Sequence, residues 1–163
     1  MLTADRLRHV LAYDPETGLF QWRNPPGRRG KAGDAVGCAN SAGYLRVMVD
    51  KRSYLLHRLA WLFMTGVWPT GNIDHIDGNP LNNRIVNLRE CTQSQNAGNS
   101  RAQRRNTSGI KGVSLNKASG KWFATIGADG KSRHLGRFAT KEQAAEAYAN
   151  AALAQFGEFA RLA

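Results

Sequence analysis

The stretch NIDHIDGNPLNNRIVNLRECTQSQN, residues 72–96, concentrates small polar side chains in one short part of the chain. It contains an Asp-His pair at positions 74 and 75, a run of Asn, and a last Asn at position 96. Asn, Asp and Gly dominate turns for backbone reasons alone, so one interpretation is a set of turns. The other is a site in which these groups hold a metal ion and a water molecule.

The order of residue types within this stretch predicts two extended segments followed by a helix. NIDHI is typical of a strand, DGNPLNN of a loop and RIVNL of a second extended segment. Thr92 is a suitable N-cap for a helix that starts beside it. This arrangement places His75 on the first strand, Asn87 on the second and Asn96 on the helix.

The composition favours a polyanionic partner. The 163 residues carry a formal net charge of +11 and have a pI of about 10.4, which favours nucleic acid. We expect no membrane partner, because no apolar run approaches a membrane span and no amphipathic basic helix stands out. Residues 1–12 include Asp5 and lack an apolar core, which predicts no signal peptide and a cytoplasmic location.

Cysteine usage excludes one class of metal site. Cys38 and Cys91 are the two cysteines, and neither belongs to a CxxC pair, so a four-Cys zinc ribbon is excluded. Two separate thiols suit a reducing cytosol. An interaction module that binds zinc through both cysteines and two histidines is an alternative, but the wide spacings argue against it.

The charge distribution divides the chain in two. Residues 1–96 hold 12 Lys and Arg against 8 Asp and Glu, whereas residues 97–163 hold 11 against 4. The polar stretch AGNSRAQRRNTSG at 97–109 predicts a linker. Its three arginines are either solvated or hold phosphates, and the basic character of the chain favours phosphates: Arg101, Arg104 and Arg105. We therefore expect domains at 1–96 and 109–163, joined by a basic linker at 97–108.

Both halves show α+β patterns. In the first half, Thr3 caps a short helix, LFQWR and GYLRVMVD are strand-like, and YLLHRLAWLFMTG is helical by length and apolar content. In the second half, KGVSLN, KWFATIG and RHLGRF predict three antiparallel strands. Thr140 and Gln143 form a capping-box pattern at the start of an Ala-rich helix that covers one face of this sheet.

Residues 57–96 resemble the HNH nucleases of phages and of group I intron homing endonucleases, in the variant that ends in Asn. The matching elements are HRLAWLF, the Asp-His pair, NRIVNLRE and the final Asn, in that order. The resemblance implies a ββα-metal nuclease module preceded by a small β-rich part. Residues 1–54 look like the front part of the same nucleases, and we expect them to support the nuclease module.

The chemistry of phosphodiester hydrolysis requires residue types found in this pattern. Asp74 and Asn96 offer hard oxygen ligands that suit Mg²⁺. His75 would be the general base, as in the family, because imidazole titrates near neutral pH. Asn87 would bond the backbone across the hairpin and hold the His75 loop in shape. Because neighbouring residues of a strand face opposite sides, Asp74 and His75 need a local distortion to serve one site.

Several neighbouring residues have two interpretations. His57 is either a buried core histidine or a group that supports the site. Asn82 and Asn83 are candidates for bonding the hairpin, and Asn83 also for touching the site. Many HNH sites end in His; the final Asn96 favours Mg²⁺ or Mn²⁺ over Zn²⁺ and leaves the number of strands cut open.

The second half independently resembles the AP2 DNA-binding domain. The matching elements are GIKGVS, GKWFATI, HLGRF and KEQAAEAYANAA. Plant AP2 domains read bases with several arginines on the sheet, and this chain has fewer there, which implies more phosphate contact and less base reading. The candidate DNA contacts are Lys111, Ser114, Asn116, Lys117, Lys121, Phe123, Thr125, Lys131, Arg133, His134 and Arg137.

Together these patterns predict a metal-dependent DNA endonuclease of a bacterial or phage-infected cell. The HNH-like part would cleave double-stranded DNA with Mg²⁺ or Mn²⁺, and the AP2-like part would give site preference. The best alternative is a DNA-binding regulator that does not cleave because its nuclease site has degenerated. The sequence leaves the oligomeric state open, and a monomer is compatible with it.

Overall fold

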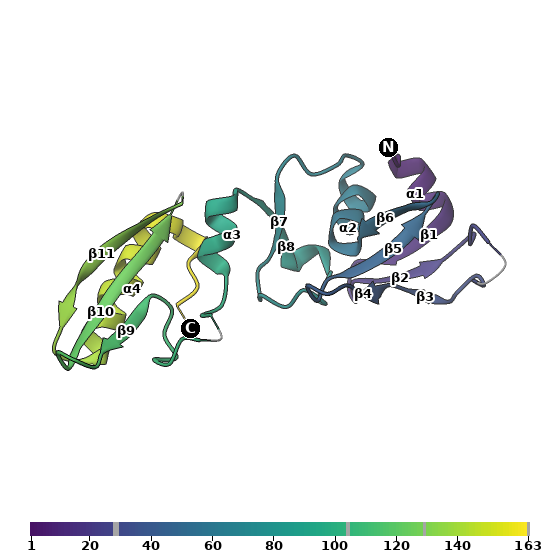
Figure 1. The fold of residues 1–163 in the computed structure, drawn as a ribbon. Coiled ribbons are helices and arrows are strands. Elements are labelled where there is room, and N and C mark those ends of the chain that lie inside the picture. The colour runs from purple at the N-terminus through teal and green to yellow at the C-terminus, as the bar shows by residue number, and fades with distance from the viewer. Residues whose placement is uncertain (28–29, 104, 129, 163) are drawn as a thin grey trace. The chain divides into compact units, whose positions relative to one another are not determined.

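The computed structural model describes residues 1–27, 30–103, 105–128 and 130–162. It is a mixed α/β structure with small antiparallel sheets, divided into two compact units, Met1–Glu90 and Cys91–Ala163 (Figure 1). Each unit is described by itself. Within the described residues, every helix is too short or too polar to cross a membrane.

The first unit alternates short strands with two helices. Its sheets have the strand orders β1-β2-β3 and β4-β5-β6, and β7 pairs with β8. The elements are α1 (Ala4–Val10), β1 (Leu11–Asp14), β2 (Leu19–Trp22), β3 (Ala35–Val36), β4 (Cys38–Ala39), β5 (Leu45–Val49), β6 (Arg52–Leu55), α2 (Leu56–Thr65), β7 (Asn72–His75), the 3-10 helix η1 (Ile85–Asn87) and β8 (Leu88–Cys91).

Local sequence explains how these elements start and pack. The Thr3 hydroxyl oxygen accepts a hydrogen bond from the Arg6 backbone N–H and caps α1, as predicted. In β5, Val47 and Val49 are buried between exposed neighbours, which confirms the predicted alternation. The core beneath these elements consists largely of aliphatic side chains together with the rings of Tyr13 and Phe20. Its most deeply buried members include Leu7, Leu11, Phe20, Val49, Leu56, Leu59 and Leu62.

Two details of the first unit differ from the prediction. The segment YLLHRLAWLFMTG is not helical throughout, because its first two residues belong to β6 and pair with β5. The helix α2 therefore starts at Leu56. The short strands β3 and β4 lie in a segment for which the sequence predicted no element. Each is only two residues long and is stabilised by its partner strand.

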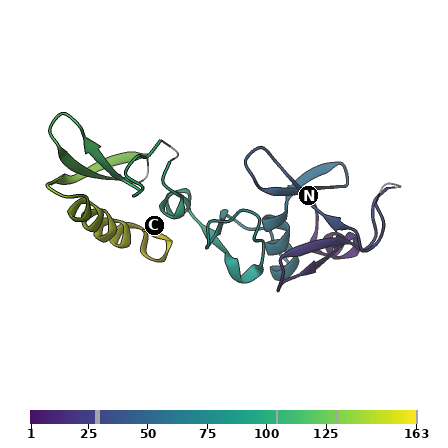
Figure 2. The same ribbon diagram turned by 90° about the horizontal axis from the view of Figure 1, so that it is seen from below.

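The second unit contains a three-stranded antiparallel sheet covered by one helix. Its elements are α3 (Gln93–Asn99), β9 (Val113–Asn116), β10 (Lys121–Ala128), β11 (Lys131–Phe138), α4 (Lys141–Phe156) and the 3-10 helix η2 (Gly157–Phe159). The strand order is β11-β10-β9, and α4 contacts all three strands from one face (Figure 2). The three strands and the covering helix are those that the local sequence patterns predicted, and their likeness to AP2 domains stays a prediction.

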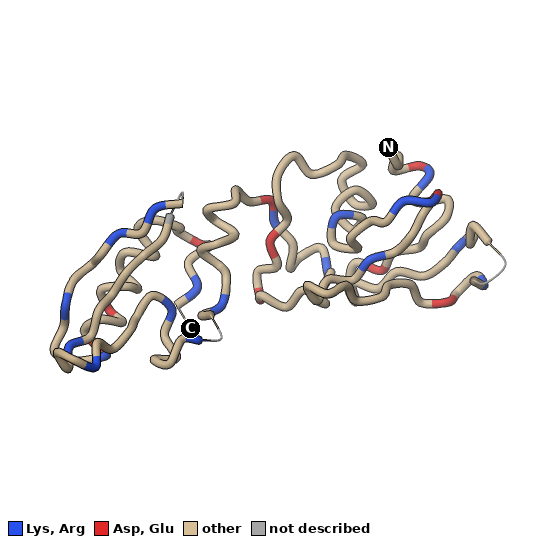
Figure 3. Tube along the Cα trace, viewed as in Figure 1, with Lys and Arg blue, Asp and Glu red and all other residues tan. Residues whose placement is uncertain are grey.

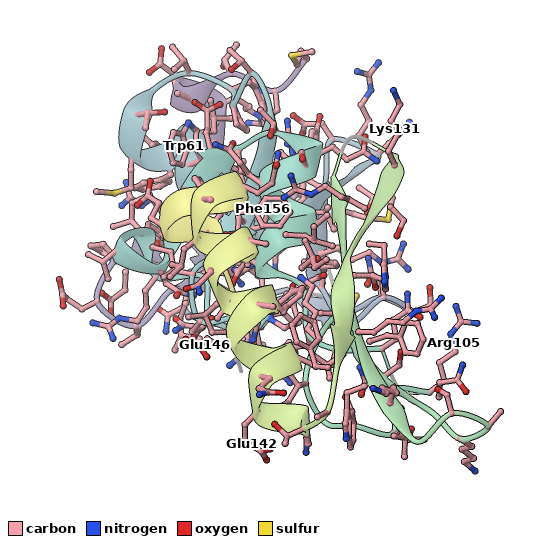
Figure 4. The ribbon with its side chains drawn as sticks, turned by 90° about the vertical axis from the view of Figure 1, so that its left-hand side faces the viewer. Trp61, Arg105, Lys131, Glu142, Glu146 and Phe156 are labelled. Carbon is pink, nitrogen blue, oxygen red and sulfur yellow. The ribbon has the colours of Figure 1, made fainter. Side chains whose placement is uncertain are left out.

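The helix α4 separates an apolar face from an acidic one. Its buried residues recur at four-residue spacing and face the sheet: Ala144, Tyr148, Ala152 and Phe156. Glu142 and Glu146 are exposed and lie on α4 away from the sheet (Figure 4). Small alanine side chains at the buried positions let the helix approach the strands closely.

The helix α3 packs against other elements of the second unit. A Cβ added at Gly98 would lie within 2.7 Å of the Phe156 ring, so the glycine permits this close approach. The Lys111 ammonium donates to the carbonyl oxygens of Ala97 and Gly98 at 2.6 and 2.7 Å. Residues 97–99, which were predicted to start the linker, are thus the last residues of a packed helix.

Two glycines test the packing of the second unit. Gly112 and Gly120 both have φ near +70°, at +71° and +65°, but an added Cβ would meet the Tyr148 ring at 2.3 Å only at Gly112. We expect Gly120→Ala to cost about 1 kcal/mol of unfolding free energy from backbone strain, and Gly112→Ala about 1–3 kcal/mol more from overpacking. Urea unfolding of the two variants checks this, and equal losses would contradict it.

Candidate active site

The candidate site is built on the end of β7. Asp74 and His75 are the last two residues of this strand, and they are only 4% and 5% exposed. Strand alternation turns neighbouring side chains to opposite sides, yet here the surrounding chain encloses both. Adjacent acid and imidazole groups are thus both held in a desolvated part of the first unit.

The His75 ring is surrounded by polar and aromatic groups. Its Nε2 atom lies 3.1 Å from the side-chain oxygen of Asn83. The His57 ring, on α2, meets it edge-on with 5.1 Å between ring centroids. Tyr44 lies beside both rings, with centroid distances of 5.2 Å to His57 and 6.0 Å to His75. These contacts fix the orientation of the imidazole.

Asn87 lies in a different element from the one predicted. It is the last residue of η1, directly before β8, rather than a residue of the second strand. The chain makes a 3-10 turn there because the Asn87 amide bonds the preceding loop: it donates to the Asp77 side chain at 3.0 Å and to the Asn82 carbonyl at 2.8 Å. Its side-chain oxygen accepts from the Asp77 N–H. Asn87 thereby holds the loop that follows His75.

Asp77 organises the same loop through its carboxylate. Burial of the carboxylate raises its pKa. Hydrogen bonds from the Asn79 backbone and from the side chains of Asn82 and Asn87 together lower the pKa by more than burial raises it, so the net pKa lies below its usual value. The carboxylate therefore remains an acceptor of hydrogen bonds over the physiological pH range. Asp77 and Gly78 were predicted as turn residues, and Asp77 also links Asn82 to Asn87.

Asp74 already binds a cationic group of the protein. Its Oδ2 atom accepts from Arg89 Nε at 3.0 Å, and both side chains are largely buried, at 5% and 15% exposure. Carboxylate oxygen is a ligand type that Mg²⁺ prefers, so the donor type fits a divalent metal ion. A metal ion at Asp74 would compete with the Arg89 guanidinium for this carboxylate, because the two positive charges repel each other.

Asn96, the second predicted metal ligand, lies on α3 in the second unit. Thr92 caps this helix and forms a capping box with Gln95, which confirms the predicted N-cap. Asp74 belongs to the first unit, so its pairing with Asn96 at one metal ion stays a prediction.

Three buried polar atoms around the hairpin have no hydrogen-bond partner among the described residues. They are His57 Nδ1, Asn83 Nδ2 and Arg84 Nε. An unmade hydrogen bond in a buried position costs about 1–3 kcal/mol, so such atoms are rare in folded proteins. Two of the three groups, His57 and Asn83, contact His75, so this part of the site can receive further partners from water or a substrate.

Comparison with known proteins assigns this region to a family. Residues 54–98 match the model of the HNH endonuclease family, and this segment includes α2, β7, η1, β8 and most of α3. Residues 54–98 form an HNH endonuclease domain. The match covers the His57, Asp74, His75 and Asn87 positions together.

Two viral proteins are similar to the chain over longer segments. Protein 3.8 of Escherichia phage T7 is 41% identical over 80 residues, which are 48% of this chain and 66% of that protein. A protein named uncharacterized HNH endonuclease, from Acanthamoeba polyphaga mimivirus, is 35% identical over 116 residues, which are 70% of this chain and 59% of that protein. The chain thus covers less than two thirds of the length of each of these two relatives. No solved structure matches it significantly.

His57 is the most strongly perturbed histidine of the HNH domain. Burial lowers its pKa to about 3, with further lowering by the charges of His75 and Arg58. The ring is 5% exposed, so the neutral form is the one that the fold accommodates. Both predicted interpretations, a core histidine and a supporting group, are compatible with this position.

The pKa of His57 predicts how stability changes with pH. The unfolded chain binds a proton at this ring below about pH 6.5, whereas the folded chain does so only near pH 3. The unfolding free energy should therefore fall as pH drops through this window, by about 1.4 kcal/mol per pH unit from this group. His57→Phe should remove that slope in urea titrations at pH 7, 6 and 5. Parallel profiles for the two proteins would contradict it.

The predicted DNA contacts lie mostly on exposed parts of the second unit. The tube in Figure 3 marks several Lys and Arg positions along the strands of its sheet. The exposed members are Arg101, Arg105, Ser114, Asn116, Lys117, Lys121, Lys131, Arg133, His134 and Arg137. Arg104 lies outside the described residues. In Figure 4, Arg105 and Lys131 lie on the sheet side of the unit, opposite the acidic side of α4.

Lys111 has a different environment from the one predicted. Its ammonium is half-buried and bonded to the last carbonyls of α3, and burial lowers its pKa to about 8, followed by the effect of the Arg161 charge. A cation at the C-terminal end of a helix stabilises the helix dipole. The structure therefore gives Lys111 a structural partner in place of a phosphate.

Along β10, Phe123 and Thr125 alternate with Trp122, Ala124 and Ile126 and lie on the sheet face opposite α4. The latter three join the core beneath α4. The Phe123 ring is flanked by the Arg137 guanidinium at 5.3 Å and the His134 ring at 5.5 Å. An aromatic ring beside an Arg guanidinium is a common feature of surfaces that bind nucleic acid.

Two residues beside the candidate site were missed by sequence reasoning. Arg89 follows Leu88 on β8, and its buried pairing with Asp74 was not visible without the strand pairing. Tyr44 precedes β5 and reaches both histidine rings from thirteen residues before His57. No local pattern identifies such a contact.

Proposed function

We propose that the chain is a metal-dependent DNA endonuclease that hydrolyses phosphodiester bonds with His75 as general base. The observation that carries the proposal is the buried Asp74–His75 pair at the end of β7, inside a segment that matches the HNH endonuclease family. The viral relatives support it because one bears an HNH endonuclease name.

The protein groups divide the work of hydrolysis among them. His75 would take a proton from the attacking water, which then adds to phosphorus while the bond to the leaving oxygen breaks. Asn87 keeps the loop after His75 in place through its bonds to Asp77 and Asn82. Asn83 and the aromatic groups around the imidazole restrict its rotation. Positioning of this kind converts bound substrate into a reactive arrangement.

Asp74 and Asn96 would hold the divalent ion by their side-chain oxygens. When bound, Mg²⁺ or Mn²⁺ would neutralise phosphate charge and stabilise the leaving oxygen. Two protein oxygens suffice for Mg²⁺, which keeps several waters in its coordination sphere. The described residues contain no group of three or more His, Cys, Asp and Glu placed to hold a metal ion.

A plasmid assay separates the proposal from its alternatives. Supercoiled plasmid is incubated with the full chain and Mg²⁺, and in parallel with EDTA. We expect relaxed or linear plasmid with Mg²⁺ and none with EDTA. A regulator with a degenerate site would bind the plasmid and leave it supercoiled under both conditions.

We further propose that the second unit holds DNA, as its AP2-like pattern implies. Support comes from the exposed cations on its sheet and from Phe123 between Arg137 and His134. Exposed Glu142 and Glu146 on the outer side of α4 would repel phosphates, so the sheet side is the better interface.

The salt dependence of binding tests this division of labour. We expect replacement of Lys121, Arg133 and Arg137 by Gln to reduce the slope of log affinity against log salt by about 2.7, because each phosphate contact contributes about 0.9. The matched control replaces three exposed cations of the first unit, Arg46, Lys51 and Arg52, and should leave the slope nearly unchanged. Binding titrations on one duplex at several salt concentrations give both slopes. Equal slopes in wild type and the sheet variant would refute the assignment.

A further inference from the structure

The second unit contains a cavity that the proposed cleavage reaction does not use. It has a volume of about 540 Å³ and is lined by residues from the chain before β9, from β9 and β10, and from α4. Every one of its described lining residues belongs to the second unit. Cavities of about 300–1,000 Å³ are typical of sites for small molecules. The cavity is therefore large enough for a ligand of the size of a nucleotide.

Positive charge dominates the polar lining of this cavity. Arg101, Arg105 and Lys111 line it, and its described lining residues include no Asp or Glu. The Arg105 Nε–H donates to the Gln103 side chain at 2.9 Å, and a guanidinium has further N–H donors on its two terminal nitrogens. The planar donors of arginine match the oxygens of a phosphate group. The lining therefore favours an anionic ligand, and a phosphate above all.

The Tyr148 hydroxyl is a polar group without a partner in the cavity lining. Tyr148 lies on α4, is only 2% exposed, and makes no hydrogen bond to the residues that the structure describes. A buried tyrosine hydroxyl normally has a hydrogen-bond partner. Burial raises the pKa of this hydroxyl, so it stays protonated and remains a donor. A ligand in the cavity would supply the missing acceptor.

Apolar groups form another part of the lining. Val113 and the rings of Tyr148 and Phe156 line the cavity, and Figure 4 labels Phe156 on α4 and Arg105 on the sheet side of the unit. Inorganic phosphate would use the arginines and leave these apolar groups without a ligand partner. A ligand that joins a phosphate to a flat ring system would use both kinds of lining.

Hydrogen bonds hold the chain before β9 in place around the cavity. The Asn106 side-chain amide donates to the Ile110 carbonyl at 2.8 Å, and the Asn106 N–H donates to the Gln103 carbonyl at 2.8 Å. The Ser108 hydroxyl is buried and donates to the Val113 carbonyl at 2.7 Å. A preformed site loses less binding free energy to ordering of the chain than a flexible one does.

We propose that this cavity binds a single nucleotide, with the phosphate on Arg101 and Arg105 and the sugar or base on the Tyr148 hydroxyl. A free nucleotide and an unpaired nucleotide of a DNA strand offer the same phosphate, sugar and base, so both are sources of this ligand. Binding in the cavity requires no cleavage. A failure of nucleotide binding would therefore leave the nuclease proposal standing, and a chain that never cuts DNA would leave the nucleotide site standing.

The test follows backbone amides of the full chain by ¹H–¹⁵N NMR during titration with deoxyadenosine 5′-monophosphate. Gly112 and Gly127 line the cavity and report on it, whereas Gly18 lies in the first unit and is the reference. We expect shifts at Gly112 and Gly127 and none at Gly18. Deoxyadenosine and inorganic phosphate should each bind at least about tenfold more weakly, because each lacks one half of the ligand. Inorganic phosphate that binds equally well would overturn the assignment to a nucleotide.

Variants connect the binding to the named side chains. The combined change of Arg101→Gln and Arg105→Gln should raise the Kd of the nucleotide about 10- to 100-fold, and Tyr148→Phe, which keeps the ring, about 2- to 10-fold. Lys141→Gln is the matched control, because Lys141 is a cation of the same unit that lies outside the cavity lining, and its Kd should stay within about twofold. Unchanged affinity in the arginine and tyrosine variants would overturn the proposal.

Two duplexes distinguish the sources of the nucleotide. One is fully paired, and the other contains one unpaired adenine. Shifts at Gly112 and Gly127 with the second duplex and not with the first would identify a nucleotide of DNA as the ligand, and shifts with the monophosphate alone would identify a free nucleotide. Equal shifts with both duplexes, or none with any of these probes, would refute a nucleotide site in the cavity.

Discussion

His75→Ala removes cleavage and leaves DNA binding intact. The imidazole accepts a proton from water and does not hold phosphates, so the loss falls on the chemical step. We expect the single-turnover rate to fall roughly 100- to 10,000-fold, the usual contribution of a general base. The dissociation constant for the same duplex should stay within a factor of about three, because the imidazole makes no contact that holds the DNA. A tenfold change would correspond to about 1.4 kcal/mol of binding free energy.

Controls separate this loss from unfolding. His75 is buried, so the variant needs a melting curve that shows a cooperative transition above the assay temperature. His9→Ala is the matched control, because His9 is an exposed histidine on α1 in the same unit. A His75→Ala protein that cuts at the wild-type rate would exclude His75 as the base.

Asp74→Asn should weaken the binding of the divalent metal ion. The change keeps the shape of the side chain and removes the charge, so cleavage at low Mg²⁺ should fall by at least about 100-fold and recover in part with Mn²⁺ or with more Mg²⁺. Asn96→Ala should act in the same direction. EDTA should stop the wild-type reaction.

Metal binding can be followed without activity. A ligand at 100 times its dissociation constant stabilises the folded state by about 2.7 kcal/mol, so Mg²⁺ should raise the melting temperature of wild type and not that of Asp74→Asn. Asp50→Asn is the matched control, because Asp50 pairs with Arg6 in the way that Asp74 pairs with Arg89, but on the exposed surface. Equal Mg²⁺ shifts in all three proteins would place the metal elsewhere.

Elements with strong local signals could be predicted from the sequence. Thr3, Thr92 and Thr140 each cap a helix as expected, because an N-cap side chain bonds backbone within three residues. The alternation in β5 and the three strands ahead of α4 also follow from local patterns. The positions of Asp74 and His75 at the end of β7 could also be predicted from the local sequence.

Contacts between distant segments could not be predicted in this way. The two-residue strands β3 and β4 exist through pairing with β2 and β5 rather than through their own propensity. Asn87 lies in a 3-10 turn because its side-chain amide donates a hydrogen bond to a backbone carbonyl of the preceding loop. The nearby apolar residues Ile85 and Leu88 suggest a strand instead. The contact of Tyr13 with Asn83 joins residues seventy positions apart, and no pattern within either segment indicates it.

The general-base role of His75 is the central claim, and chemical rescue tests it most directly. His75→Gly deletes the imidazole, and free imidazole is then titrated into a single-turnover cleavage assay at saturating protein and Mg²⁺. The account predicts a rate that rises with imidazole concentration in His75→Gly and remains flat in wild type and in Asp74→Asn. A folded His75→Gly protein that binds the duplex and gains no rate from imidazole would contradict it.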